Sequence, residues 1–177
     1  MSIQASTGEQ LKDLGISDPF DLYKAIAGFS SNVNYAGTSI YTIRGGGFQE
    51  NSLATSPTVS VYLDEAPLQC SPMTRGASLD VQRVEALKGP QGTLFGQNAT
   101  GGAVNFIANK PTQEFEAGFT ASYGTFESFD LEGYVSGPIN DSLGFRLAIR
   151  SQTSGDWQES YLNDDEAGAK DEFAYRA

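Results

Sequence analysis

The sequence has 177 residues, with 22 acidic and 11 basic side chains and a net charge of −11 at pH 7. Nucleic acid is a poor partner for such a surface, because neutralising phosphates requires clustered Lys and Arg. The chain has no histidine, the commonest general base and metal ligand. Its single cysteine permits neither an internal disulfide nor a cysteine-rich metal site. With 39% hydrophobic residues the chain is able to bury a core, and its length fits one or two domains.

The sequence contains no run of 18 apolar residues, which excludes a transmembrane helix. Its first five residues have neither the basic region nor the apolar region of a signal peptide. A membrane protein built from strands is not excluded by this, because barrel strands are short, alternate in polarity and give a weak hydropathy signal.

Two short helices are predicted near the N-terminus. Thr7 is suited to cap a helix that runs from Gly8 to Leu14, and Gly15 is suited to end it. Asp18 and Pro19 open a second helix in the same way, with Asp as the cap and Pro at the first helical position. Apolar residues recur along this second segment up to position 27, which indicates an ordinary packing helix.

Four strands are predicted in the same half of the chain. They cover residues 39–44, 58–64, 84–88 and 103–109, where β-branched and other apolar residues alternate with polar ones. A turn is expected at 64–67, irregular polar loops at 48–57 and 68–78, and short helical turns at 79–83 and 91–95. Because helices and strands interleave, the sequence predicts a small mixed sheet with flanking helices.

The stretch from 83 to 105 is rich in glycine, the residue used where a backbone turns tightly or approaches another backbone closely. A second glycine run, Arg44-Gly45-Gly46-Gly47, ends the strand at 39–44. A phosphate-binding loop is the alternative interpretation of such a stretch. That alternative needs Gly-Lys-Ser/Thr or a G-x-G-x-x-G that opens a helix. Residues 96–101 contain no Lys, and a strand follows them, so nucleotide binding is disfavoured.

After Lys110 the pattern changes to strict alternation of apolar and polar residues over 115–123, 129–136 and 143–150. Each run is close to the ~9–11 residues that a strand needs to cross a bilayer. Asp130, Glu132, Arg146 and Arg150 fall on one face and suit a watery lumen, whereas the apolar face suits lipid. A half-buried sheet in a soluble sandwich has the same period, so alternation alone leaves both architectures open.

The connections between these runs differ in length. Residues 136–141 contain Gly, Pro, Asn and Asp and predict a short turn. Residues 154–171 form a long acidic segment, which is interpreted as a solvated loop rather than a cation site. Phe173 and Tyr175 mark the start of a fourth strand. Short turns alternating with long loops are typical of outer-membrane barrels.

The glycine-rich stretch, placed after Arg44-Gly45-Gly46-Gly47 and before alternating strands, closely resembles the end of the plug domain of TonB-dependent outer-membrane receptors. The resemblance implies an α+β plug domain at residues 1–110 and the first antiparallel strands of a transmembrane β-barrel at 111–177. It therefore favours the barrel over the sandwich. Since the smallest barrels need about 8 strands, we expect this chain to be the N-terminal part of a longer protein, without its signal peptide and TonB box.

The resemblance also implies a function. Receptors of this family import a scarce solute, most often a ferric siderophore, across the bacterial outer membrane, and the plug gates the barrel. The implied partners are TonB of the inner-membrane energising complex, the ferric siderophore or a similar ligand, and outer-membrane lipid. No catalytic residue, cofactor or metal site is implied. The alternatives are an importer of cobalamin, haem or glycans, a signalling receptor, and a soluble binding module.

Two sets of site residues follow from this interpretation. The polar loops are expected to meet the ligand through six residues: Gln49, Asn51, Ser52, Met73, Thr74 and Arg75. The plug motif is carried over onto twelve residues: Arg44, Gly45, Gly47, Arg83, Glu85, Lys88, Gly89, Pro90, Gly92, Gly96, Gly101 and Gly102. Among these, Arg44 and Lys88 are expected to be structural or gating charges that pair with acidic residues such as Glu85.

Overall fold

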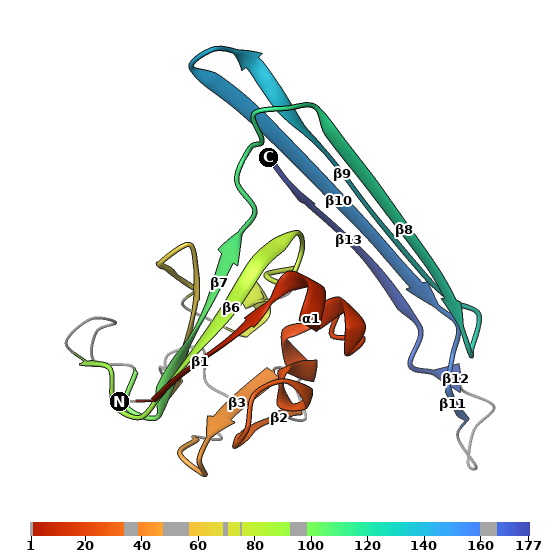
Figure 1. Ribbon diagram of the computed structural model, residues 1–177. Coiled ribbons are helices and arrows are strands. Elements are labelled where there is room, and N and C mark those ends of the chain that lie inside the picture. Colours follow the sequence, from red (N-terminus) through yellow and green to blue (C-terminus); the bar gives the residue numbers. More distant parts are fainter. Residues whose placement is uncertain are drawn as a thin grey trace. The chain divides into compact units, whose positions relative to one another are not determined.

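The computed structural model describes residues 2–33, 39–47, 57–68, 71–74, 76–92, 99–159 and 166–177 (Figure 1). The chain forms two compact units, Met1–Asn109 and Lys110–Ala177. Among the helices in these ranges, none is both long and apolar enough to cross a membrane.

The first unit is built on a mixed five-stranded sheet. Its strand order is β1-β6-β7-β4-β5, and all neighbours are antiparallel except β4 and β7, which are parallel. The strands are β1 (Ser2–Thr7), β4 (Val59–Leu63), β5 (Ala66–Leu68), β6 (Val81–Lys88) and β7 (Gly102–Ala108). A separate antiparallel pair consists of β2 (Phe29–Val33) and β3 (Ser39–Ile43).

The two predicted N-terminal helices are present. Thr7 caps α1 (Gly8–Asp13) in a capping box, in which its hydroxyl accepts from the Gln10 amide and the Gln10 side chain accepts from the Thr7 amide. Asp18 caps the second helix by accepting from the Phe20 amide at 2.8 Å. This helix, η1 (Pro19–Lys24), is 3₁₀ and ends earlier than predicted. A third short helix is η2 (Ser71–Thr74).

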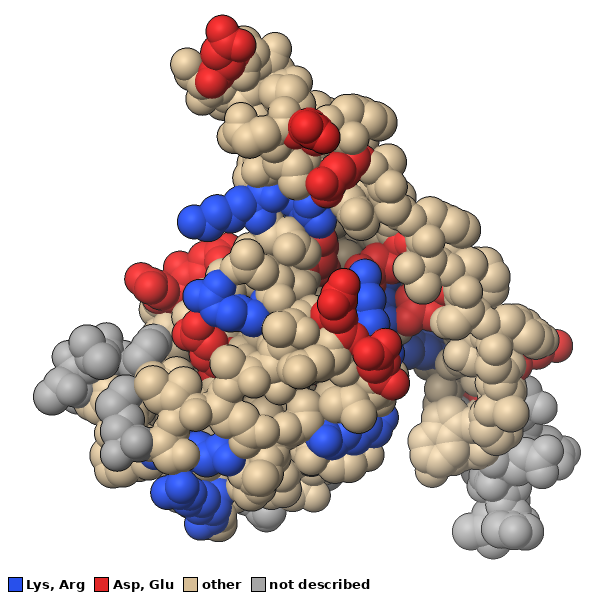
Figure 2. All heavy atoms as spheres, in the orientation of Figure 1, with Lys and Arg blue, Asp and Glu red and all other residues tan. Residues whose placement is uncertain are grey.

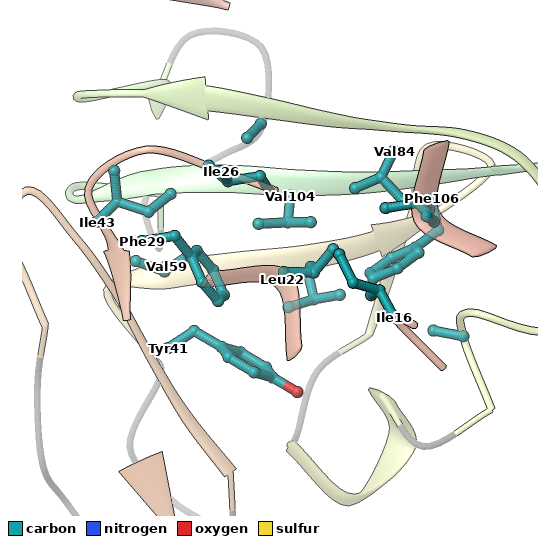
Figure 3. Close-up of a cluster of buried hydrophobic side chains, with 14 of the residues drawn as sticks. Ile16, Leu22, Ile26, Phe29, Tyr41, Ile43, Val59, Val84, Val104 and Phe106 are labelled. Atoms are coloured by element: carbon teal, nitrogen blue, oxygen red, sulfur yellow. The ribbon is translucent and has the colours of Figure 1, made fainter. Parts of the chain in front are cut away.

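The larger of two clusters of buried hydrophobic residues holds this unit together. Figure 3 shows Leu22 and Ile26, from η1 and the turn after it, on the same side of the sheet as Val59 of β4, Val84 of β6 and Val104 of β7. All five side chains are buried. Burying an aliphatic side chain of this size is worth roughly 1.5–3 kcal/mol, so this shared layer fixes η1 against the sheet.

Three strands of the first unit were not predicted from the sequence, namely β1, β2 and β5. Most side chains of β1 are exposed, so it has no apolar alternation, and its conformation depends on pairing with β6. The helical turn predicted at 79–83 is wrong, because residues 76–80 form turns and β6 already begins at Val81. The pairing with β7 extends to this residue, opposite Ala108, and so fixes the early start.

The second unit is an antiparallel sheet in the order β13-β10-β9-β8. Its strands are β8 (Glu116–Gly124), β9 (Ser128–Asn140), β10 (Leu143–Ser154) and β13 (Lys170–Arg176). Beside them lies a short pair, β11 (Gln158–Glu159) and β12 (Glu166–Ala167). β9 and β10 cover the predicted runs 129–136 and 143–150, and β8 begins one residue after the start of the run predicted at 115–123. β13 begins three residues before Phe173, inside the segment predicted as a loop.

The prediction of a turn at 136–141 is wrong for most of this segment. β9 continues through Gly137 and Pro138 to Asn140, and only residues 141 and 142 form the turn. Asn140 pairs with Leu143, and Pro138 pairs with Gly144, so Ile139 is an extra residue in an irregular register. A bulge of this kind accommodates turn-forming residues without ending the pairing.

The two faces of the second sheet differ in chemistry. On one face, the Arg150 guanidinium pairs with the Asp130 carboxylate and lies 3.9 Å from that of Glu132. On the other face, aromatic side chains are open, with exposed fractions of 71% for Phe119 and 74% for Tyr175. The register of β8, β9, β10 and β13 places the charged side chains on one face of the sheet and the exposed aromatic side chains on the other.

Three two-residue turns have both residues in the left-handed region: Arg44–Gly45, Asp64–Glu65 and Phe126–Glu127. This geometry matches the twist of hairpin strands but favours Asn, Asp and Gly. Glu65, with φ of 68°, is therefore in an unfavourable conformation for its residue type.

We predict that Glu65→Gly raises the unfolding free energy of the complete protein by about 0.5–1 kcal/mol, because glycine relieves this conformation. The backbone bond from the residue 65 amide to Asn105 Oδ1, 3.2 Å long, is kept in the variant. Denaturant-induced unfolding measures the change. The matched control is Glu9→Gly in α1, which is expected to destabilise. A lower unfolding free energy for Glu65→Gly would contradict the prediction.

Candidate functional site

Most of the predicted plug-motif residues lie where β3 ends, β6 ends and β7 begins. We call residues 44–47, 88–92 and 99–102 the glycine junction. The Gly101 amide donates to the Thr58 carbonyl at 2.8 Å. A Cβ at Gly101 would lie 2.9 Å from the carbonyl oxygen of Gly46, so two glycine runs far apart in sequence are in backbone contact.

Two glycines of the junction leave no room for a side chain, and one of them, Gly102, also has a positive φ. Gly102 has φ of 149°, and a Cβ there would lie 2.5 Å from the Leu87 carbonyl oxygen. Gly47 faces Thr42 so closely that a Cβ would overlap the Thr42 side chain. Glycine is the residue that permits such approaches, so the motif encodes the packing of β3 against the start of β7.

Hydrogen bonds align the segments on either side of the glycine-rich loop. The Gly89 amide donates to the Gly101 carbonyl at 3.3 Å, and the Gln91 amide donates to the Ala99 carbonyl at 2.8 Å. The Gln91 side chain is buried. Pro90 and Gly92 are exposed, and Gly96 lies outside the described residues. The loop that connects β6 to β7 is therefore closed at its base by backbone bonds.

The charged residues of the motif have different environments. Arg44 is exposed in the turn after β3, and its amide donates to the Gly28 carbonyl at 2.7 Å. Lys88 is only 9% exposed, and its Nζ donates to Gln4 Oε1 at 2.7 Å. Glu85 pairs with Arg83 at 2.7 Å, both on β6. The expectation that Glu85 would pair with Arg44 or Lys88 is thereby corrected.

Gln4 is a site residue that the sequence reasoning missed. Besides accepting from Lys88, its side chain donates to the Ala25 carbonyl at 2.7 Å and accepts from the Ala27 amide at 3.3 Å. It thus joins β1, the end of β6 and the segment after η1. Nothing in the sequence marks this glutamine, because the contact depends on the unpredicted strand β1.

Of the six predicted ligand residues, Gln49, Asn51, Ser52 and Arg75 lie outside the described residues. Met73 is on the surface, with an exposed fraction of 52%. Thr74 is 3% exposed, and its Oγ1 lies 3.0 Å from the hydroxyl of Tyr41 on β3. The side chain of Thr74 is therefore not available to a solute in this conformation, which corrects the prediction for this residue.

The Tyr41–Thr74 bond ties η2 to β3. Burial raises the pKa of the Tyr41 phenol, so this hydroxyl is neutral at ordinary pH. The Tyr41 ring also packs against Phe29 of β2 with the ring centroids 5.7 Å apart. The loop that carries Met73 is therefore attached to the strand that leads directly into the glycine junction.

The described part of the chain contains no group of three or more His, Cys, Asp or Glu side chains placed to hold a metal ion. On the face that Figure 2 shows, acidic and basic side chains lie in small groups that alternate over the surface. The site is thus a backbone junction with isolated charges around it.

Comparison with known proteins identifies this arrangement. The family description "TonB-dependent Receptor Plug Domain" matches residues 1–103. The chain is 31% identical over 162 residues to the pesticin receptor of Yersinia pestis, covering 90% of this chain and 24% of that protein. It is 28% identical over 145 residues to the ferripyoverdine receptor of Pseudomonas aeruginosa, covering 82% of this chain and 17% of that protein.

Solved structures share the fold. The ferric yersiniabactin uptake receptor FyuA from Yersinia pestis superposes with a TM-score of 0.80 at 28% identity, covering 95% of this chain and 27% of that one. The Pseudomonas aeruginosa receptor FpvA bound to pyoverdine has a TM-score of 0.71 at 25% identity, covering 89% and 23%. The predicted fold class, an α+β plug followed by antiparallel strands, is confirmed.

The chain spans about a quarter or less of the length of these relatives. Within that span the family match covers the glycine junction, four strands of the first sheet and the first two residues of β7. The chain therefore belongs to the TonB-dependent receptor plug domain family.

Proposed function

We propose that this chain is part of an outer-membrane receptor that imports a ferric siderophore with energy supplied through TonB. One observation carries the proposal. The chain contains a plug-type glycine junction, and 95% of this chain superposes on a ferric yersiniabactin uptake receptor. Other similar proteins are named for ferripyoverdine and ferric enterobactin. These names support a ferric siderophore as the solute of this receptor.

The chemistry of the second unit supports a place in the membrane. β9 has 13 residues and β10 has 12, which exceeds the ~9–11 residues needed to cross a bilayer. The open aromatic face, including Phe119 and Tyr175, suits lipid, and the face with Arg150 and Asp130 suits a water-filled lumen. In this proposal these strands belong to the wall of the barrel, and the first unit is the plug.

The plug acts as a gate in this proposal, and no covalent bond is made or broken, so the receptor is not an enzyme. The solute meets the outward loops of the plug, which include Met73. The Tyr41–Thr74 bond links that loop to β3, and β3 leads to the Arg44 turn of the glycine junction. Solute binding and gate movement thereby share one strand.

The proposal is tested by iron uptake into cells that lack other siderophore receptors and carry the complete protein. Radiolabelled ferric siderophores of the yersiniabactin and pyoverdine types are the probes. Uptake of at least one is expected and is expected to stop when TonB is removed. Surface binding without TonB-dependent uptake would contradict import and would favour a signalling receptor.

We predict that Arg44→Ala in the complete receptor lowers the uptake rate about tenfold and leaves solute affinity within about threefold, if the exposed guanidinium acts in gating. Lys24→Ala is the matched control, since Lys24 lies outside the motif and forms a partly exposed pair with Asp21 that contributes little to stability. Uptake and equilibrium binding are measured on the same cells. Equal loss of both by Arg44→Ala would show that the residue is structural.

We predict that alanine at five positions together weakens solute binding by at least about tenfold, because each polar or flexible side chain adds contact free energy at a solute interface. These positions are Gln49, Asn51, Ser52, Met73 and Arg75. Thr74→Ala serves as the control, and it is expected to lower stability with little change in affinity because Thr74 is buried. Unchanged affinity in the five-position variant would remove these loops from the binding site.

A further inference from the structure

The chain leaves the first unit at the end of β7, and this end is held in an unusual way. β7 lies between β6 and β4 in the sheet (Figure 1). Ala108 is its last residue, Asn109 follows, and Lys110 begins the second unit. The covalent connection between the two units therefore follows directly after Asn109.

Asp64 holds this end from the side of β4. The parallel pairing of β4 with β7 stops at Leu63 and Phe106, because the chain turns away at Asp64, where φ is 47°. Beyond that point the Asp64 carboxylate accepts from the Ala108 amide at 2.9 Å, and the Asp64 amide donates to the Phe106 carbonyl at 2.8 Å. The carboxylate thus replaces the acceptor that β4 would have supplied had it continued.

Asp80 holds the same end from the side of β6. Its carbonyl accepts from the Asn109 amide at 3.0 Å, and its Oδ1 accepts from Asn109 Nδ2 at 2.8 Å. The residue is only 7% exposed and has φ of 49°. A hydrogen bond to a carboxylate is stronger than one between neutral groups, and burial protects it from competing water.

The other chain end of this unit is held differently. β1 is the edge strand and pairs only with β6. Its side chains at positions 2, 3, 5 and 7 are exposed, and Gln4 supplies the side-chain contacts described above. The apolar core, which lies around β4, β6 and β7, therefore stabilises the exit of the unit more than its beginning.

We propose that Asp64 and Asp80 form a carboxylate clamp that fixes the end of β7. Because of this clamp, the backbone at the exit of the first unit opens less readily than that of the edge strand β1. The clamp is a property of the fold and does not depend on which solute the receptor carries.

The obvious alternative is that both residues are aspartate only because aspartate tolerates left-handed backbone conformations. The two explanations predict different amide exchange when the side-chain hydrogen bonds are broken and the backbone conformation is unchanged. Hydrogen–deuterium exchange at residues 106–110 of the complete protein in a bilayer reports on this, because the Ala108 and Asn109 amides are both donors in the clamp.

Asn109→Asp replaces the Nδ2 donor with a second carboxylate beside Asp80. We expect amide exchange at 106–110 to become at least about tenfold faster, with β1 exchange unchanged. Combining Asn109→Asp with Asp80→Asn restores a donor opposite a carboxylate and is expected to return exchange to within about threefold of the wild type. Asp80 has other interactions, so Asp80→Asn alone is measured to complete the cycle. Asn32→Asp, on exposed β2, controls for the chemical change itself.

Unchanged exchange in Asn109→Asp, or the absence of recovery in the double variant, would overturn the clamp. If Asn109→Asp does not assemble in the membrane, Asp64→Gly replaces it, since glycine keeps the left-handed turn and removes the carboxylate. Faster exchange of Ala108 in Asp64→Gly than in Glu65→Gly, a change in the same turn, would support the clamp. Equal exchange in these two variants would overturn it.

Discussion

The architecture of the first unit depends on the contact between the backbones of Gly46 and Gly101. No side chain separates these residues, and a methyl group at Gly101 would meet a carbonyl oxygen. This contact brings the end of β3 to the start of β7, which places the β2–β3 pair and η1 over the same face of the sheet as the core residues. The core is therefore apolar in content but is positioned by a junction in which seven of the thirteen residues are glycine.

The two units solve the problem of burial in opposite ways. The first unit covers an apolar layer with short helices and a strand pair, so large side chains such as Phe106 are fully buried there. The second unit leaves its apolar side chains open and joins its polar ones to each other, as in the contact of the Arg150 guanidinium with Asp130. A soluble sandwich would require the open face to be covered by protein, whereas a barrel in lipid uses it as it stands.

Local signals in the sequence predicted those elements whose cause is local. The Thr7 and Asp18 caps gave both helix starts, and strict alternation gave the strands from β8 to β10. Elements that depend on partners were not predicted. β1 is a strand because β6 lies beside it, and β9 continues through Pro138 because β10 pairs with it across a bulge. A prediction from residue propensities ends a strand at Gly-Pro, because it does not include the pairing partners β6 and β10.

The same distinction applies to the candidate site residues. The glycines were predicted because their spacing is itself the cause of the contact. Thr74 was assigned to a ligand surface because its loop is polar, but the hydroxyl of Tyr41 lies opposite it in the folded chain. Gln4 was overlooked for the same reason, since its three partners come from segments about 20 and 80 residues away. Composition of a loop does not reveal which of its side chains point inward.

The salt bridge between β9 and β10 has a consequence for how these strands find each other. A register shift of one position would move the apolar side chains to the polar face of the sheet, so the alternation alone disfavours this shift. Sliding by two positions keeps every side chain on its proper face, and alternation does not oppose that error. Arg150 would then lose its place opposite Glu132 and beside Asp130. The partly buried ion pair thus adds a polar preference for the observed alignment, which the period of two alone does not supply.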